Sequence, residues 1–240
     1  MLTYEKLKQK PREFLSATGM TQGEFEIVLP SFATAYDKLY PKNLTFDGRV
    51  RARAGGAGVK GVLSKPEDKL LFSLVYQKTN PLQTMHGLQF GLSQGQTNYW
   101  IHRLLPVMRE TLAVLGMKPE REAHRVATNF AAVEGGANLA IDGTERRLQR
   151  SSDPVIQKQK YSGKKKAHTD KNILLVNENT RRVVYLSPTV EGKQHDSRVA
   201  KEAAITYPAN AILNKDSGFQ GYEPDGVLSR QVKKKRKVKR

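Results

Sequence analysis

Cysteine is absent from the 240-residue sequence. This absence excludes disulfide bonds, cysteine-ligated zinc sites and thiol nucleophiles, so a metal ion would need oxygen or imidazole ligands. The sequence also lacks an apolar run near the roughly 20 residues that a membrane span requires. Its charged N-terminus has no apolar segment of the kind that secretory signals contain. We therefore expect the protein to stay in the compartment where it is made.

Acidic residues are few relative to basic ones. The 41 Lys and Arg residues against 23 Asp and Glu residues give a formal net charge of +18. Such a charge favours a polyanionic partner, most often a nucleic acid, although ribosomal and membrane-surface proteins can be equally basic. Hydrophobic residues make up 38% of the chain, which is enough for a buried core and argues against a wholly disordered protein.

The first 64 residues are predicted to contain two helices and a basic linker. Apolar residues recur at helical spacing around Phe14 and again from Phe25 to Leu39. Thr21 followed by Glu24 matches a capping box and marks the start of the second helix. Residues 41–64 contain the stretch RVRARAGGAGVKG, which lacks the G-K-[ST] sequence of a phosphate-binding loop, so a linker is favoured over a nucleotide site.

Residues 65–110 have the pattern of a helix-turn-helix. Pro66 opens one helix, Pro81 a second, Gly91 supplies the turn and Ser93 caps a third. In this motif the early residues of the last helix face the major groove of DNA. The candidate DNA-binding residues are Gln94, Gln96, Thr97, Asn98, Tyr99, His102 and Arg103. A helical bundle without DNA contact has the same spacing, and the net positive charge favours DNA.

The rest of the chain predicts a helical connector at residues 111–136 and then a mixed α/β sheet at 137–228. Strands are expected at 138–143, 172–178, 182–190 and 210–222, a basic hairpin-like loop at 145–168 and a helix at 195–204. Residues 229–240 form a strongly basic tail that we expect to be disordered.

Two acids occupy predicted strand ends. Asp142 follows the apolar run LAI, and Asp216 follows AILNK. Two carboxylates that meet at a sheet edge can bind Mg²⁺ or Mn²⁺, whereas the alternative is that each Asp only caps a turn before glycine. Cations that could contact a phosphate chain beside Asp142 are Arg146, Arg147, Lys164, Lys165, Lys166 and His168. His195 and Asp196 either cap a helix or support the metal ligands from outside.

Several of these segments resemble a known family. IDGTERRLQR, QKYSGKKKAHTDKN, VVYLSPTVEGKQHDS and LNKDSGFQGY together resemble bacterial insertion-sequence transposases of the DDE superfamily, which are related to Harbinger-like transposases. Residues 65–108 resemble the helix-turn-helix domain that precedes the nuclease domain in these proteins. The resemblance runs from about residue 65 to about residue 230.

The resemblance implies a ribonuclease-H-like catalytic domain in which three acids hold two Mg²⁺ ions. Water, and then a 3′-hydroxyl, would attack DNA phosphodiesters without a covalent enzyme intermediate. Asp142 matches the first acid and Asp216 the second. The family's third acid is a Glu on a later helix, and no such pattern follows here, since Glu223 and Asp225 lie too near Asp216. We therefore expect a truncated or frameshifted copy, or the first of two reading frames, with impaired cleavage.

The expected partners are double-stranded DNA at the element's terminal repeats and target site, a second copy of the chain in a homodimer, and a second reading-frame product. The expected location is the nucleoid of the cytoplasm, or the nucleus if KKKRKV acts as an import signal in a eukaryote. The main alternative is a non-catalytic DNA-binding regulator of transposition or a domesticated repressor. A basic RNA-binding protein is disfavoured because the cations cluster around Asp142 and the last helix of the turn motif.

Overall fold

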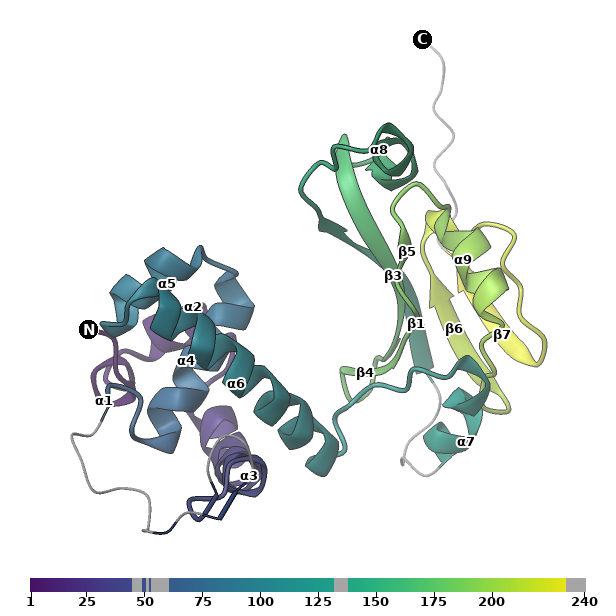
Figure 1. Ribbon diagram of the computed structural model, residues 1–240. Helices are drawn as coiled ribbons and strands as arrows, with labels where there is room; N and C mark the ends of the chain where they lie inside the picture. The colour runs from purple at the N-terminus through teal and green to yellow at the C-terminus, as the bar shows by residue number, and fades with distance from the viewer. Residues whose placement is uncertain (45–48, 51, 53–60, 132–137, 232–240) are drawn as a thin grey trace. The chain divides into compact units, whose positions relative to one another are not determined.

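The computed structural model describes residues 1–44, 49, 50, 52, 61–131 and 138–231 (Figure 1). The chain divides into two compact units, Met1–Gly116 and Met117–Arg240. Most of the predicted linker stretch at 49–61 and all of the KKKRKV segment lie outside the described residues. In the part of the chain that is described, no helix is both long enough and apolar enough to cross a membrane.

The N-terminal unit is helical. Its helices are α1 (Tyr4–Leu7), α2 (Pro11–Thr18), α3 (Gln22–Leu39), α4 (Pro66–Thr79), α5 (Gln83–Phe90) and α6 (Gln94–Val114). Residues 1–40 thus form three helices rather than the two predicted: the additional helix is α1, which begins after the cap residue Thr3 and is separate from α2, whose first residue is Pro11. The capping box of Thr21 and Glu24 at the start of α3 is confirmed, and a second one joins Ser93 to Gln96 at the start of α6.

One hydrophobic core joins all six of these helices. Buried phenylalanines of α2 and α3, Phe14 and Phe25, belong to the same cluster as Phe72 of α4 and Leu104 of α6. The helices predicted before residue 64 and the helix-turn-helix predicted after it therefore share a core. Gly87 lets α5 and α6 approach closely, because a Cβ atom there would lie 2.6 Å from Oγ1 of Thr97 in α6.

The second unit is built on a mixed sheet. Its strands are β1 (Asn138–Arg147), β2 (Tyr161–Ser162), β3 (Ala167–Asn177), β4 (Arg182–Leu186), β5 (Val190–Glu191), β6 (Ala211–Lys215) and β7 (Val227–Gln231). The order is β2-β3-β1-β6-β7, with β4 and β5 also paired to β3. β1 runs antiparallel to β3 and parallel to β6, and β6 runs parallel to β7. This is the ribonuclease-H-like mixed sheet that the sequence predicted.

Helices of the second unit are η1 (Ala123–Arg125), α7 (Val126–Ala131), α8 (Pro154–Lys160), α9 (Asp196–Ala203) and η2 (Ser217–Phe219). α8 corrects the prediction of a hairpin-like loop over 145–168. Asp153 caps this helix by accepting hydrogen bonds from the amides of Val155 and Ile156, and Pro154 suits its first turn. β7 also extends into the predicted tail, because Arg230 pairs with Asn214 and Gln231 with Lys215 of β6.

The core of the second unit lies on one face of the sheet. Because side chains alternate along a strand, Leu139 and Ile141 of β1 point to the same side, where Val199 and Ala200 of α9 belong to the same buried cluster. Figure 1 shows α9 lying along the sheet near β6. Alternate residues on the other side remain partly exposed, namely Ala140, Leu174, Val176 and Ile212.

We expect acid to destabilise the N-terminal unit through His86, a fully buried residue among Phe72, Tyr76 and Phe90. Burial lowers the pKa of His86 to about 4 from an ordinary 6.5. The unfolded chain therefore binds an extra proton between these values, and stability falls as the pH falls through this window. The loss between pH 7 and pH 4.5 should be about 2.5 kcal/mol.

Urea unfolding followed by the fluorescence of Trp100, the single tryptophan, would measure this loss, because Trp100 packs against the core of the N-terminal unit. His86→Leu should remove the His86 component of the pH dependence. An equal loss of stability in the variant and the original protein would contradict the assignment.

Candidate active site

Asp142 and Asp216 lie side by side because of the register between their strands. The parallel pairing of β1 with β6 ends at Ile141 opposite Lys215, and the two acids are the next residues on each strand. Neighbouring strands lie about 4.8 Å apart, so the two backbones meet at one edge of the sheet. Asp142 does not end its strand, however, since β1 continues to Arg147 by pairing with β3.

Both carboxylates are exposed and held by a nearby amide. Oδ1 of Asp142 accepts a hydrogen bond of 2.7 Å from the amide of Gly143. Oδ1 of Asp216 accepts one of 2.8 Å from the amide of Gly218 and so caps η2. The turn-capping role considered as the alternative is therefore present at Asp216, and each group retains a second oxygen for another partner.

A cavity of about 580 Å³ opens beside these acids. Its walls include the acids Glu145, Asp196 and Asp216, the bases Lys164, Lys171 and Lys193, and His195. Asp142 does not line the cavity, but its neighbour Gly143 lies against Asp196. His195 is the exposed N-cap residue of α9 and makes no side-chain capping bond, and Asp196 is the first residue of that helix.

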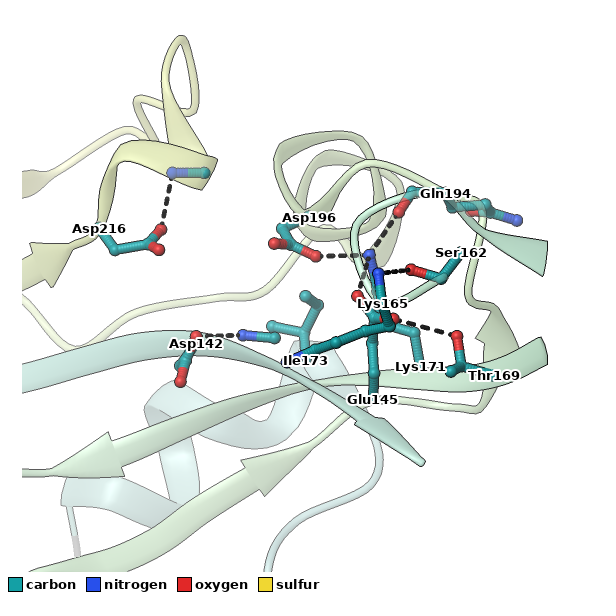
Figure 2. A network of polar contacts seen from close by, with 12 residues as sticks. Asp142, Glu145, Ser162, Lys165, Thr169, Lys171, Ile173, Gln194, Asp196 and Asp216 are labelled. Atoms are coloured by element: carbon teal, nitrogen blue, oxygen red, sulfur yellow. Dashed lines mark hydrogen bonds and ion pairs between the residues drawn. The ribbon is translucent and has the colours of Figure 1, made fainter. Parts of the chain in front are cut away.

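A buried ion cluster forms the inner wall of the cavity (Figure 2). Nζ of Lys171 lies 2.8 Å from Oδ1 of Asp196 and 3.5 Å from Oε1 of Glu145. Burial raises the pKa of Glu145, but hydrogen bonds from Ser162 and Thr169 and the charge of Lys171 outweigh burial, so its pKa lies below the ordinary value. Sequence reasoning missed Glu145 and Lys171, which lie directly opposite each other on β1 and β3. This pairing depends on the register of the two strands, which spacing along the chain does not give.

The predicted cations occupy two neighbouring stretches of the sheet. Arg146 and Arg147 are exposed at the end of β1, and Lys164, Lys165 and Lys166 are exposed between β2 and β3. Lys164 lines the cavity that also contains Asp216. His168 is half-buried against the ring of Tyr161. Positive charge therefore lies beside the acids, as a path for a phosphate chain requires.

The candidate DNA-binding residues of α6 differ in exposure. Gln94, Gln96, Tyr99 and His102 are exposed. The side-chain amides of Gln94 and Asn98 donate hydrogen bonds of 2.7 Å and 3.3 Å to Oε1 of Gln83, a residue of α5 that sequence reasoning missed. These side chains form an ordered polar group on the surface of the turn motif.

Two other residues of α6 make internal contacts. Thr97 is completely buried, and its hydroxyl donates to the carbonyl of Ser93, so it cannot reach DNA in this structure. The guanidinium carbon of Arg103 lies 3.6 Å from the ring centroid of Tyr40, and its Nε donates to the hydroxyl of Tyr36. Arg103 therefore packs α6 against α3, with its head group held by tyrosines.

The acids have the donor chemistry of a hard divalent cation site. Carboxylate oxygens are preferred ligands of Mg²⁺ and Mn²⁺, and Asp142 and Asp216 supply them from adjacent strands. Across the described residues, no three His, Asp or Glu side chains are grouped closely enough to hold a metal ion. The ligand type therefore fits such an ion, with two carboxylates available to hold it.

Lys215 anchors the loop that follows Asp216, and its side chain is fully buried. Its Nζ donates to the carbonyl of Tyr222 and lies 2.7 Å from Oε1 of Glu223. We expect Lys215→Met to destabilise the protein by about 1–3 kcal/mol, because a buried carbonyl loses its partner. The freed loop should also expose Phe219 and Tyr222, both now buried.

Thermal unfolding and limited chymotrypsin digestion would measure both effects, with faster cleavage after Phe219 and Tyr222. Glu223→Gln is the control, because its side chain is 63% exposed and its loss should have a smaller effect. Equal digestion rates for Lys215→Met and the original protein would show that Lys215 does not anchor this loop.

Comparisons with known proteins match both units. Residues 62–113 match the family described as the helix-turn-helix of DDE superfamily endonuclease, and residues 141–239 match the family described as DDE superfamily endonuclease. The chain is 25% identical over 175 residues to a protein of Microchaete diplosiphon named "Probable transposase for insertion sequence element IS702". That similarity covers 72% of this chain and 59% of the relative. No solved structure matches the chain.

Proposed function

Because this chain belongs to the DDE superfamily, we propose that it acts as the transposase of a DNA insertion element. The N-terminal unit would bind the terminal-repeat DNA, and the second unit would hydrolyse a phosphodiester and join the freed 3′-hydroxyl to target DNA. The register that brings Asp142 next to Asp216 is the observation that carries this proposal.

Asp142 and Asp216 would hold the divalent cation, Mg²⁺ or Mn²⁺, on which the DDE endonuclease family generally depends. When bound, such an ion stabilises negative charge on the oxygens of a phosphoryl group. The basic side chains of the protein would have a different role. Lys164 in the cavity wall, with Arg146 and Arg147 on β1, would hold the DNA backbone beside the acids through its phosphates.

Recognition of DNA sequence would rest on the polar surface of α6. Gln and Asn side chains can pair with the N6 and N7 edge of adenine in the major groove. Gln94 and Asn98 are already ordered by Gln83, so less side-chain entropy would be lost when they bind. Tyr99 and His102, which are exposed on the same helix, would contact bases or the sugar-phosphate backbone.

A non-catalytic regulator is the second candidate. One observation favours it: the described residues gather no three-ligand metal site. Such a protein would keep the DNA-binding helices and the basic surface and would occupy the element's ends without cutting them.

A metal-dependent nicking assay on DNA containing the element's ends tests the proposed reaction. We expect strand cleavage that requires Mg²⁺ or Mn²⁺ and that falls about 100-fold or more in Asp142→Asn and in Asp216→Asn, because each change removes a charge that would hold the ion. DNA binding should persist in both variants. Tight binding without cleavage in either ion would favour the regulator.

A second set of variants tests the assignment of the two surfaces. Gln94→Ala and Asn98→Ala should each remove about 1–3 kcal/mol of discrimination between specific and non-specific DNA. Replacing Lys164, Lys165 and Lys166 together by Ala should instead weaken binding to both DNAs and reduce the salt dependence, by about 2.7 in the slope of log K against log salt.

Fluorescence anisotropy at several salt concentrations measures both effects. Gln77→Ala is the matched control, because Gln77 is an exposed glutamine of another helix, α4. A loss of discrimination in Gln77→Ala as large as in Gln94→Ala would argue against readout by α6.

A further inference from the structure

We propose that Lys171 is a positioning residue of the acidic site: it holds the carboxylate of Asp196 between the segments that carry Asp142 and Asp216. A third negative charge then faces the space in which the divalent cation would be held. This inference rests on the proposed function, because it assigns Asp196 a task in that same reaction.

Lys171 is fixed by three oxygen atoms from three segments of the chain. Its side chain is 5% exposed, and its Nζ donates a hydrogen bond of 2.6 Å to the carbonyl of Gln194 in addition to its ion pairs with Asp196 and Glu145. A buried ammonium needs such partners because its desolvation is costly. The lysine therefore ties α9 and the turn before it to β1 and β3.

The two carboxylates that share Lys171 are not equivalent. Glu145 is 3% exposed in its side chain and also accepts hydrogen bonds from Thr169 and Ser162. Asp196 uses Oδ1 for Lys171, and its Oδ2 has no hydrogen-bond or ion-pair partner among the described residues. The two carboxylates and one ammonium together carry a net charge of −1, and Asp196 is the acid of this cluster that keeps an oxygen without such a partner.

Two glycines leave room for the carboxylate of Asp196 beside the strand-end acids. A Cβ atom at Gly143, next to Asp142, would lie 2.7 Å from Oδ1 of Asp196. A Cβ atom at Gly218 would lie 3.2 Å from Oδ2 of Asp196 and 3.0 Å from Oδ1 of Asp216. The carboxylate of Asp196 thus occupies space that any side chain at these positions would fill, and Figure 2 shows it facing the two acids.

The arrangement explains why a lysine is buried beside an acidic site. Without Lys171, Asp196 and Glu145 would repel each other in a poorly solvated wall, and Asp196 would turn toward water. With Lys171, the carboxylate keeps one orientation before any cation arrives. Lys171 would therefore act on the cation through Asp196 and would not contact it.

Binding of Mn²⁺ by the full chain, measured by electron paramagnetic resonance, tests this role separately from activity. Lys171→Met removes the charge that holds Asp196, whereas Gly143→Ala displaces the same carboxylate without removing a charge. Each should weaken Mn²⁺ binding about tenfold or more, as loss of groups that support metal ligands does. Asp196→Asn, which keeps the shape and loses the charge, should do the same, and Lys171→Arg should restore part of the affinity.

Arg198→Gln is the control, because Arg198 is an exposed residue of α9 whose side chain forms an ion pair with Glu202 on the same helix. The Mn²⁺ affinity of this variant should equal that of the original protein. Thermal unfolding without metal is measured for every variant. If Lys171→Met does not fold, Asp196→Asn and Gly143→Ala decide the question.

Two results would overturn the inference. In the first, folded Lys171→Met and folded Asp196→Asn bind Mn²⁺ with an affinity within about twofold of that of the original protein. Lys171 then only stabilises the fold, whatever the stability of the two variants, and the proposed function stands. If the original protein binds no Mn²⁺ and cuts no DNA, the proposed function fails and the positioning role fails with it.

Discussion

The pairing of β1 with strands on both sides is the constraint on which the second unit depends. β1 lies between β3 and β6, antiparallel to the first and parallel to the second. The parallel pairing sets Asp142 beside Asp216, and the antiparallel pairing sets Glu145 opposite Lys171. A shift of β1 by one residue would reverse the face of every side chain on it, so the apolar core and the acidic site share one register.

Much of this organisation could be predicted from the sequence because it follows local rules. Capping residues such as Thr21 and Ser93 and the apolar runs around Ile141 and Leu213 identify elements through their immediate neighbours. The donor acids also follow from position, since each comes after an apolar run in the sequence. These predictions needed only spacing and residue type.

The remaining features depend on contacts between distant segments. The burial of Thr97 results from the close approach of α5 at Gly87, and the tyrosines around Arg103 come from α3, more than sixty residues earlier. The link from Lys171 to Asp196 depends on how α9 folds back onto the sheet. α8 differs, because its capping signal, Asp153 before Pro154, lies within a strongly basic stretch that predicts a loop.

The shared core of the N-terminal unit limits how the DNA-binding region can be inherited. The amide of Tyr4 donates to Asp68 over 2.8 Å, the amide of Leu2 donates to the carbonyl of Gln89 over 2.7 Å, and the hydroxyl of Tyr40 donates to the carbonyl of Arg103. A gene segment that encoded only α4 to α6 would therefore yield helices with an uncovered apolar side. Transfer of these helices to another protein would need to carry the first forty residues together with α4 to α6, as one evolutionary unit.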